Sequence, residues 1–152
     1  MSRIIRIAAA QMGPTQRSDD REQTLSRMIK LLESAAAQGA TLVVYPELAF
    51  TTFFPRWLLQ QNDLISQFET AMPNPNVQAL FDRAKELGVG FYVGYAELTP
   101  EGQQFNTSII VAPDGTVLGK YRKVHLPGSV EPRDGAKSVS YTHLTLPTIL
   151  LV

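Results

Sequence analysis

The sequence predicts an α/β fold in which a parallel sheet is extended by an antiparallel part. Short apolar runs at 4–10, 41–48 and 89–98 alternate with segments of helical periodicity, which is the pattern of strand-helix-strand units. Two further strand-like runs flank Pro113-Asp114-Gly115, which is typical of a hairpin turn. The 152 residues, 44% of them hydrophobic, suffice for one core.

The first unit is a strand, a helix and a second strand. The apolar run at 4–10 forms the first strand, and Asp19 with Glu22 approximates a capping box at the start of the helix. Gly39 stands where a C-terminal cap belongs. The apolar stripe of this helix consists of Leu25, Met28, Ile29, Leu32, Ala35 and Ala36. The run at 41–48 (TLVVYPEL) then forms a strand that places Glu47 at the rim of the sheet, where open α/β folds hold ligands.

The second unit adds another helix and the antiparallel part. Asn74 and Pro75 occupy the order expected for an N-cap and a first helical turn, and Gly88 ends the helix. Its buried stripe consists of Val77, Leu80, Phe81, Ala84 and Leu87. The next strand covers 89–98, and the hairpin strands cover 105–111 and 116–121.

Glu47 and Lys123 are the candidate functional residues. A carboxylate and an ammonium can act as a base and an oxyanion stabiliser. In most proteins, however, a glutamate after proline is a solvated or ion-paired residue, and Lys120, Arg122 and Lys123 would form a basic edge strand. The alternation of side chains along a strand places Lys123 on the face opposite Lys120 and Arg122.

Several motifs resemble the nitrilase, or carbon-nitrogen hydrolase, superfamily over residues 4 to about 136. They are YPEL at 45–48 and FNTSIIVAPDGTVLGKYRKVHL at 105–126. ELAFTTFFPRW at 47–57, GYAEL at 94–98 and HLPGSVEPR at 125–133 look most like N-carbamoyl-D-amino acid hydrolases. The resemblance implies an α/β fold that is the N-terminal part of a nitrilase-type αββα four-layer sandwich, with a Glu-Lys-Cys triad.

The resemblance also implies roles for the two candidates. Glu47 would be the general base, a role that calls for a partly desolvated carboxylate with a raised pKa, and Lys123 would stabilise the oxyanion. The implied reaction converts an N-carbamoyl-D-amino acid into a D-amino acid, ammonia and carbon dioxide. The chain contains no cysteine, so we expect it to be inactive as written.

A β-ureidopropionase-like or other amidase activity is the alternative within the family, and a non-catalytic binding or assembly module is the alternative outside it. Arg56 is a candidate partner for a substrate carboxylate or for an internal acid.

The sequence divides at about residue 137. We expect 1–137 to be a partial carbon-nitrogen hydrolase domain, because the family's second glutamate and its cysteine would lie beyond Lys123. We expect 138–152 to be a non-native tail, derived from an adapter or from a reading frame that runs off a gene fragment. Helical period, caps and charge stop together there, and codons for VSYTHLTLPT (139–148) resemble an adapter used in preparing sequencing libraries.

The composition restricts the classes of molecule that the chain is expected to bind. Lys plus Arg and Asp plus Glu both number 14, so net charge gives no argument for nucleic acid or an anionic membrane surface. Two histidines and no cysteine are too few for a metal centre, and no cofactor is implied.

No apolar run has the length of a signal-peptide core or a membrane span, which predicts a cytoplasmic protein. The expected partners are a small amide or carbamoyl substrate and, for a full-length form, further copies of itself.

Overall fold

The protein is built around one five-stranded sheet whose strands lie in chain order. The computed structural model describes residues 4–57 and 59–124. The strands are β1 (Ile7–Ala9), β2 (Leu42–Val44), β3 (Gly90–Leu98), β4 (Gln104–Val111) and β5 (Val117–Arg122). β1, β2 and β3 pair in parallel, and β3, β4 and β5 pair antiparallel. The predicted α/β sheet with an antiparallel extension is therefore confirmed.

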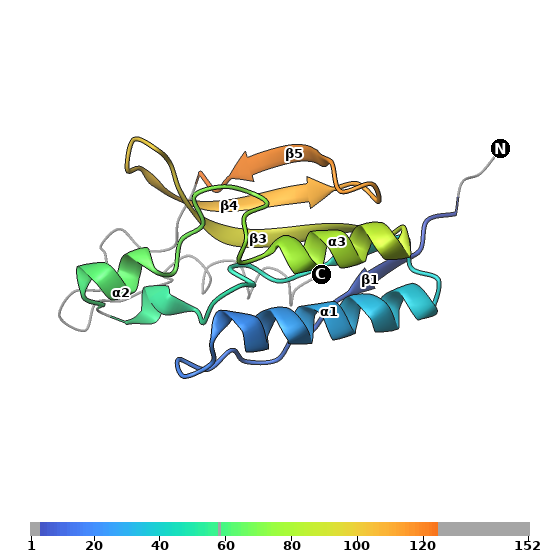
Figure 1. The fold of residues 1–152 in the computed structure, drawn as a ribbon, viewed down its shortest axis with the longest axis horizontal. Coiled ribbons are helices and arrows are strands. Elements are labelled where there is room, and N and C mark those ends of the chain that lie inside the picture. The colour runs from blue at the N-terminus through green and yellow to red at the C-terminus, as the bar shows by residue number, and fades with distance from the viewer. Residues whose placement is uncertain (1–3, 58, 125–152) are drawn as a thin grey trace, which may run out of the picture.

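Two helices cover one face of this sheet, which we call the helix face. α1 (Arg21–Ala37) and α3 (Gln78–Leu87) lie side by side along it, and β5 forms the far edge of the sheet (Figure 1). Burying apolar side chains between these layers is the main favourable contribution to the fold. The core residues that are at most 3% exposed include Met28, Leu32, Val43, Leu80, Phe81, Phe91, Val93, Ile109 and Val111.

The capping box of α1 lies one residue later than the sequence indicated. Asp20 is the N-cap: its carboxylate accepts from the Gln23 backbone N–H at 2.7 Å, and the Gln23 side chain accepts from the Asp20 N–H at 3.2 Å. Asp19 instead accepts from the Gln16 N–H at 3.0 Å and pairs with Arg27 at 3.1 Å. The prediction of Asp19 and Glu22 was wrong because neighbouring aspartates offer the same capping chemistry.

The start of α3 also differs from the prediction, whereas its end agrees. Val77 is the N-cap, and Asn74 lies in the preceding turn, where its side-chain oxygen accepts from the Asn76 N–H at 2.8 Å. Gly88 has a φ of 64° and ends the helix in the left-handed region, as predicted. No pattern in the sequence predicted the 3₁₀ helix η1 (Phe54–Arg56) or the short helix α2 (Gln61–Ile65).

The opposite side of the sheet, which we call the open face, is only partly covered by described residues. Leu48, Phe54 and Trp57 pack over Ala96 near the end of β3. Farther along, Tyr92 is 36% exposed and Ile110 37% exposed. An apolar sheet face of this kind agrees with the expected N-terminal part of a four-layer sandwich, since sheets bury such faces against another layer.

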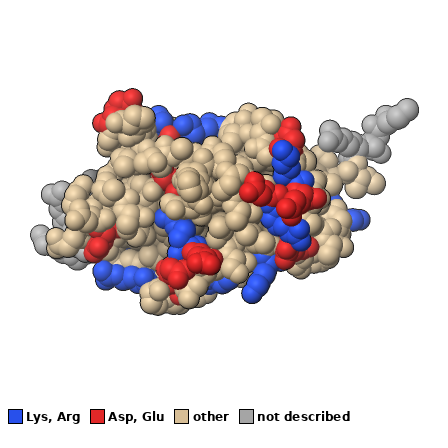
Figure 2. Space-filling view, in the orientation of Figure 1, with Lys and Arg blue, Asp and Glu red and all other residues tan. Residues whose placement is uncertain are grey.

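Charged side chains of both signs lie next to one another on the surface. Figure 2 shows Lys and Arg interleaved with Asp and Glu on the face it presents, in line with equal numbers of each in the sequence. In the part of the chain that the structure describes, no helix has the length and apolar character needed to cross a membrane.

Candidate active site

Glu47 lies in a turn beyond the carboxyl end of β2. The strand itself ends at Val44, so the predicted strand at 41–48 was too long. The Tyr45 N–H still donates to the Tyr92 carbonyl at 2.9 Å, and the Ala49 N–H donates to the Gly94 carbonyl at 2.9 Å. Between these two anchors the chain turns, and Leu48 adopts a φ of 49°. Such a positive φ in a leucine is uncommon and is held here by its surroundings.

Gly94 in β3 allows this turn to approach the sheet. A Cβ atom at Gly94 would lie 3.0 Å from the Cα of Glu47 and 3.2 Å from the backbone nitrogen of Leu48. Contacts this short would force the turn away from the strand. The absence of a side chain at Gly94 therefore sets how closely Glu47 lies against the open face.

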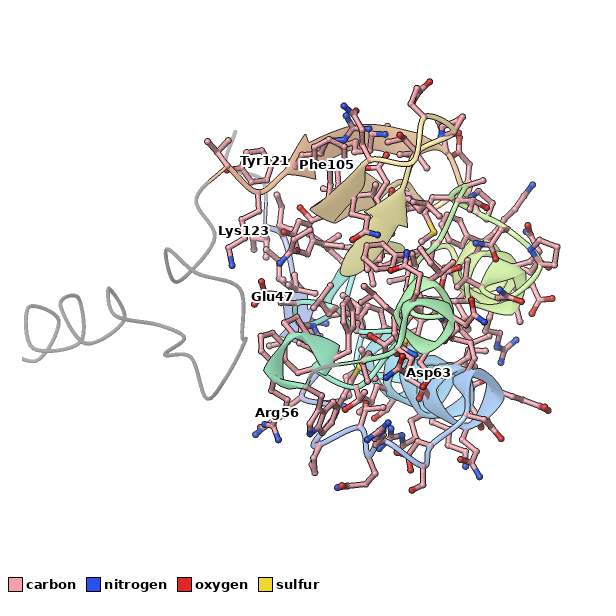
Figure 3. The ribbon with its side chains drawn as sticks, turned by 90° about the vertical axis from the view of Figure 1, so that its left-hand side faces the viewer. Glu47, Arg56, Asp63, Phe105, Tyr121 and Lys123 are labelled. Carbon is pink, nitrogen blue, oxygen red and sulfur yellow. The ribbon has the colours of Figure 1, made fainter. Side chains whose placement is uncertain are left out.

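Two side chains from later in the chain bind the Glu47 carboxylate. The Asn106 amide of β4 donates to Oε1 at 2.6 Å, and the Lys123 ammonium donates to the same oxygen at 2.8 Å. The Lys123 N–H also donates to the Asn106 carbonyl at 2.8 Å, which continues the β4–β5 ladder by one residue. Figure 3 shows Glu47 and Lys123 close together at one edge of the molecule. The structure thus brings the two sequence-predicted candidates together.

The pKa of Glu47 lies below its ordinary value. Partial burial raises the pKa, but the hydrogen bonds from Lys123 and Asn106 and the charge of Lys123 outweigh that effect. The Glu47 side chain is 46% exposed, so water still solvates part of it. The raised pKa that we expected for a general base is therefore not found in this arrangement, because the carboxylate has an ammonium partner and is still partly solvated.

The strand β5 presents cations to both faces of the sheet. Lys123 lies on the open face with Glu47, whereas Lys120 and Arg122 lie on the helix face and donate to Glu97 at 2.8 and 2.9 Å. This is the alternation that the sequence predicts. Lys120 and Arg122 are not only a basic edge, as they would be in the ordinary interpretation, because they bind a buried carboxylate.

Asn106 and Glu97 are the polar residues of this region that the sequence interpretation missed. The one available signal for Asn106 was its parity within the strand at 105–111; the β4–β5 register, which places it on the face of Lys123, comes from the structure. Arg56 does not join the pair: its guanidinium carbon lies 5.4 Å from the centroid of the Trp57 ring, and Figure 3 shows it pointing outward.

A hollow of about 480 Å³ lies elsewhere on the described surface. Its walls include Arg17, Asp19, Arg21, Thr51 and Trp57, and neither Glu47 nor Lys123 lines it. Among the described residues, no three His, Cys, Asp or Glu side chains gather where they could hold a metal ion. The chemistry available at the pair is therefore that of a carboxylate, an ammonium and an amide.

The sequence matches known proteins over most of its length. A family model for carbon-nitrogen hydrolases matches residues 6–143. Omega-amidase NIT2-A of Xenopus laevis is 32% identical over 110 residues, which cover 70% of this chain and 36% of that protein. A nitrilase of Pyrococcus abyssi is 32% identical over 81% of this chain and 44% of its own length. N-carbamoylputrescine amidase of Solanum tuberosum is 29% identical over 83% of this chain and 40% of its own length.

Solved structures of nitrilase-superfamily proteins and amidases are also similar to this chain. Nit3 of Saccharomyces cerevisiae, a member of the nitrilase superfamily, superposes with a TM-score of 0.66 and 27% identity over 80% of this chain and 45% of that one. An amidase from Nesterenkonia sp. superposes with a TM-score of 0.61 and 26% identity over 84% of this chain and 45% of that one. The chain spans less than half the length of these relatives. The chain belongs to the carbon-nitrogen hydrolase family, and its mixed sheet corresponds to the N-terminal part of the nitrilase fold.

Proposed function

We propose that this chain supplies the base and the oxyanion-stabilising cation of a cysteine-dependent carbon-nitrogen hydrolase. The observation that carries the proposal is the cluster in which Lys123 and Asn106 both donate to one oxygen of Glu47. These three side chains come from three separate segments of the chain and meet on the open face. In this proposal the nucleophile is a cysteine that is not among the 152 residues.

The proposed reaction consists of two half-reactions. Glu47 takes the thiol proton, and the thiolate sulfur forms a bond to the carbonyl carbon of the substrate. Lys123 stabilises the negative oxygen of the tetrahedral intermediate. The C–N bond then breaks, and the leaving nitrogen takes the proton back from Glu47. In the second half-reaction, water gives a proton to Glu47 and attacks the thioester, which releases the acid and the thiol.

The ion pair suggests how Glu47 acquires basicity during this cycle. While Lys123 donates to Glu47, the carboxylate is held charged and is a weak base. When the ammonium moves to an oxyanion, Glu47 loses its nearest cation and its pKa rises. A covering layer over this half-exposed site would raise it further by desolvation. Lys123 thus couples oxyanion stabilisation to the proton affinity of the base.

The proposed substrate is an N-carbamoyl-D-amino acid. Support comes from the motifs at 47–57 and 94–98 and from the likeness to N-carbamoylputrescine amidase. Another amide, including a β-ureidopropionase-like substrate, is the second candidate, because omega-amidase NIT2 sequences are also similar to this chain. A non-catalytic module is favoured only by the lack of cysteine in these 152 residues.

The test uses the product of the gene that encodes this chain, beside residues 1–152 alone. Ammonia release is measured with N-carbamoyl-D-alanine, its L enantiomer, N-carbamoyl-β-alanine and a simple ω-amide. We expect the D-carbamoyl compound to have the highest kcat/KM with a cysteine-containing gene product, and no turnover with 1–152. Turnover by 1–152 at enzyme-like rates would reject the thiol mechanism. A gene that ends at codon 152 with an inactive product would establish the non-catalytic alternative.

A further inference from the structure

Glu97 is a buried carboxylate that the proposed reaction does not use. It lies in β3 on the helix face, and its side chain is only 9% exposed. It accepts hydrogen bonds from the Thr107 hydroxyl at 2.7 Å, from Lys120 at 2.8 Å, and from two nitrogens of Arg122, each at 2.9 Å. A buried carboxylate with this many partners fixes the positions of the groups that donate to it.

The hairpin turn sets the register where β5 begins, through the hydrogen bond from the Ala112 N–H to the Thr116 carbonyl at 2.8 Å, but little else holds the far end of the strand. Its apolar side chains are exposed: Val117 to 36%, Leu118 to 65% and Tyr121 to 60%. Within residues 4–57 and 59–124 it pairs on one side only, with β4. Register is strongly specified where one face of a strand buries apolar residues and weakly specified where neither face does. Among the described residues, the helix-face contacts of Lys120 and Arg122 with Glu97 hold the end of β5 that lies away from the turn.

We propose that Glu97 is a positioning residue that holds the far end of β5 in register and thereby places Lys123 beside Glu47. The functional meaning of that placement rests on the function proposed for Lys123. The geometry follows from strand alternation. With Arg122 opposite Thr107, Arg122 points to the helix face and Lys123 points to the open face. A slip of this end by one residue would exchange these faces, carrying Lys123 away from Glu47 and both Lys120 and Arg122 away from Glu97.

Further contacts hold Arg122 in this arrangement. Its guanidinium carbon lies 4.0 Å from the centroid of the Phe105 ring, so the planar group is held by an aromatic face as well as by the carboxylate. The pKa of Glu97 is about 2, principally because Arg122 donates to it, with Lys120 and Thr107 adding to the effect against the opposing influence of burial. The carboxylate is therefore charged throughout the neutral range and binds the cations of β5 continuously.

The first test measures register by disulfide trapping, which is clean because the chain has no native cysteine. Ser108 and Tyr121 are opposite each other in β4 and β5, so Ser108→Cys with Tyr121→Cys reports the described register. Tyr92→Cys with Ile110→Cys reports the β3–β4 register and serves as an internal control. Both pairs are oxidised at low concentration, and the disulfide fraction is read by intact mass.

The two cysteine pairs are compared in matched backgrounds. Glu97→Gln removes the negative charge of Glu97, and Glu33→Gln removes a glutamate whose side chain is 41% exposed and pairs with Arg83 at 2.8 Å. We expect the β4–β5 disulfide to fall at least about fivefold in Glu97→Gln, with the β3–β4 disulfide unchanged, because only the weakly specified strand shifts. Glu33→Gln should retain both. An unchanged β4–β5 disulfide in Glu97→Gln would overturn the proposal.

The second test reads the placement of Lys123 directly. A water-soluble carbodiimide joins a carboxylate and an amine in contact into an amide, and the reagent takes up the lost water to become a urea. Glu47 and Lys123, whose atoms lie 2.8 Å apart, should give a cross-linked peptide in the unmodified chain and in Glu33→Gln. Glu97→Gln should lose that peptide. Its persistence at an unchanged yield would show that Lys123 does not depend on Glu97.

A general loss of folding is separated from a loss of register by a milder change. If Glu97→Gln also loses the β3–β4 disulfide, the double variant Lys120→Gln with Arg122→Gln is scored in the same way. It removes both cations from Glu97, leaves the Thr107 hydrogen bond, and alters side chains that are 46% and 39% exposed. Retention of both the β4–β5 disulfide and the Glu47 cross-link in this double variant then overturns the proposal. Neither readout needs catalysis, so an inactive protein would reject only the proposed function.

Discussion

The stability that Glu97 provides should depend on pH in a way that identifies this carboxylate. Its pKa is lowered from 4.5 to about 2, first by the hydrogen bonds from Arg122 and then by those from Lys120 and Thr107. A pKa that is lower in the folded state stabilises the fold above the unfolded value of 4.5, and the stabilisation is lost as pH falls towards 2. The fall in pKa corresponds to about 3 kcal/mol at pH 7.

Glu97→Gln isolates this contribution because all other acids are common to both proteins. Lys120 and Arg122 are 46% and 39% exposed and can regain water, so we expect a loss of about 2–3 kcal/mol in the free energy of unfolding at pH 7. At pH 2.5 the difference should shrink to about 1 kcal/mol, because Glu97 is then largely protonated in the unfolded chain and partly in the folded one.

The assay is urea unfolding followed by circular dichroism at submicromolar concentration, at pH 7 and pH 2.5. Glu33→Gln is the matched control and should change the free energy of unfolding by less than about 0.5 kcal/mol at either pH, because its ion pair is exposed. A difference between Glu97→Gln and the unmodified protein that is equal at the two pH values would refute the reasoning. So would a difference at pH 7 below about 0.5 kcal/mol.

In a cysteine-containing gene product, Glu47→Gln and Lys123→Ala should each lower kcat by at least about a hundredfold with circular dichroism unchanged, and near-normal kcat in either would reject the site. Gly94→Ala should lower kcat about tenfold or more, because the new Cβ displaces the turn that carries Glu47. An unchanged carbodiimide cross-link between Glu47 and Lys123 in this variant would contradict that reason. Residues 1–152 should self-associate with rising concentration in size-exclusion chromatography, and Ile110→Thr should weaken that association, whereas a concentration-independent monomer would show that the open face is not the cause. Residues 138–152 lie outside the described part of the structure. Sequencing the source DNA across codon 138 should reveal a family-like continuation in their place. Recovery of the same codons in an uninterrupted genome would refute the prediction of a non-native tail.

The main elements of the fold could be predicted because their signals are local. Apolar periodicity identified α1 and α3, and Gly88 marked the end of α3 because glycine readily adopts the required positive φ. The errors lie where two residues offer equivalent local chemistry. Asp19 and Asp20 can each cap a helix, and the choice depends on Arg27, which binds Asp19 from the second turn of α1.

The candidate site was predicted only in part, because its geometry is non-local. The motifs indicated Glu47 and Lys123, and strand parity separated Lys123 from Arg122. The lowered pKa of Glu47 could not be predicted, because it depends on hydrogen bonds from Lys123 and Asn106, which lie 76 and 59 residues away in the chain. Glu97 was missed for the same reason: a lone glutamate in an apolar strand gives no local sign that two cations from β5 will meet it.

The sequence separation of the site has a consequence for the order of folding. Asn106 lies 59 residues after Glu47, and Lys123 lies 76 residues after it. Contacts that span so much chain form late, because the intervening segment must first be ordered. During synthesis, β1, α1 and β2 can begin to associate long before β5 leaves the ribosome. Glu47 therefore spends the early part of folding without its cation, and the pair is among the last long-range contacts that the described residues can complete.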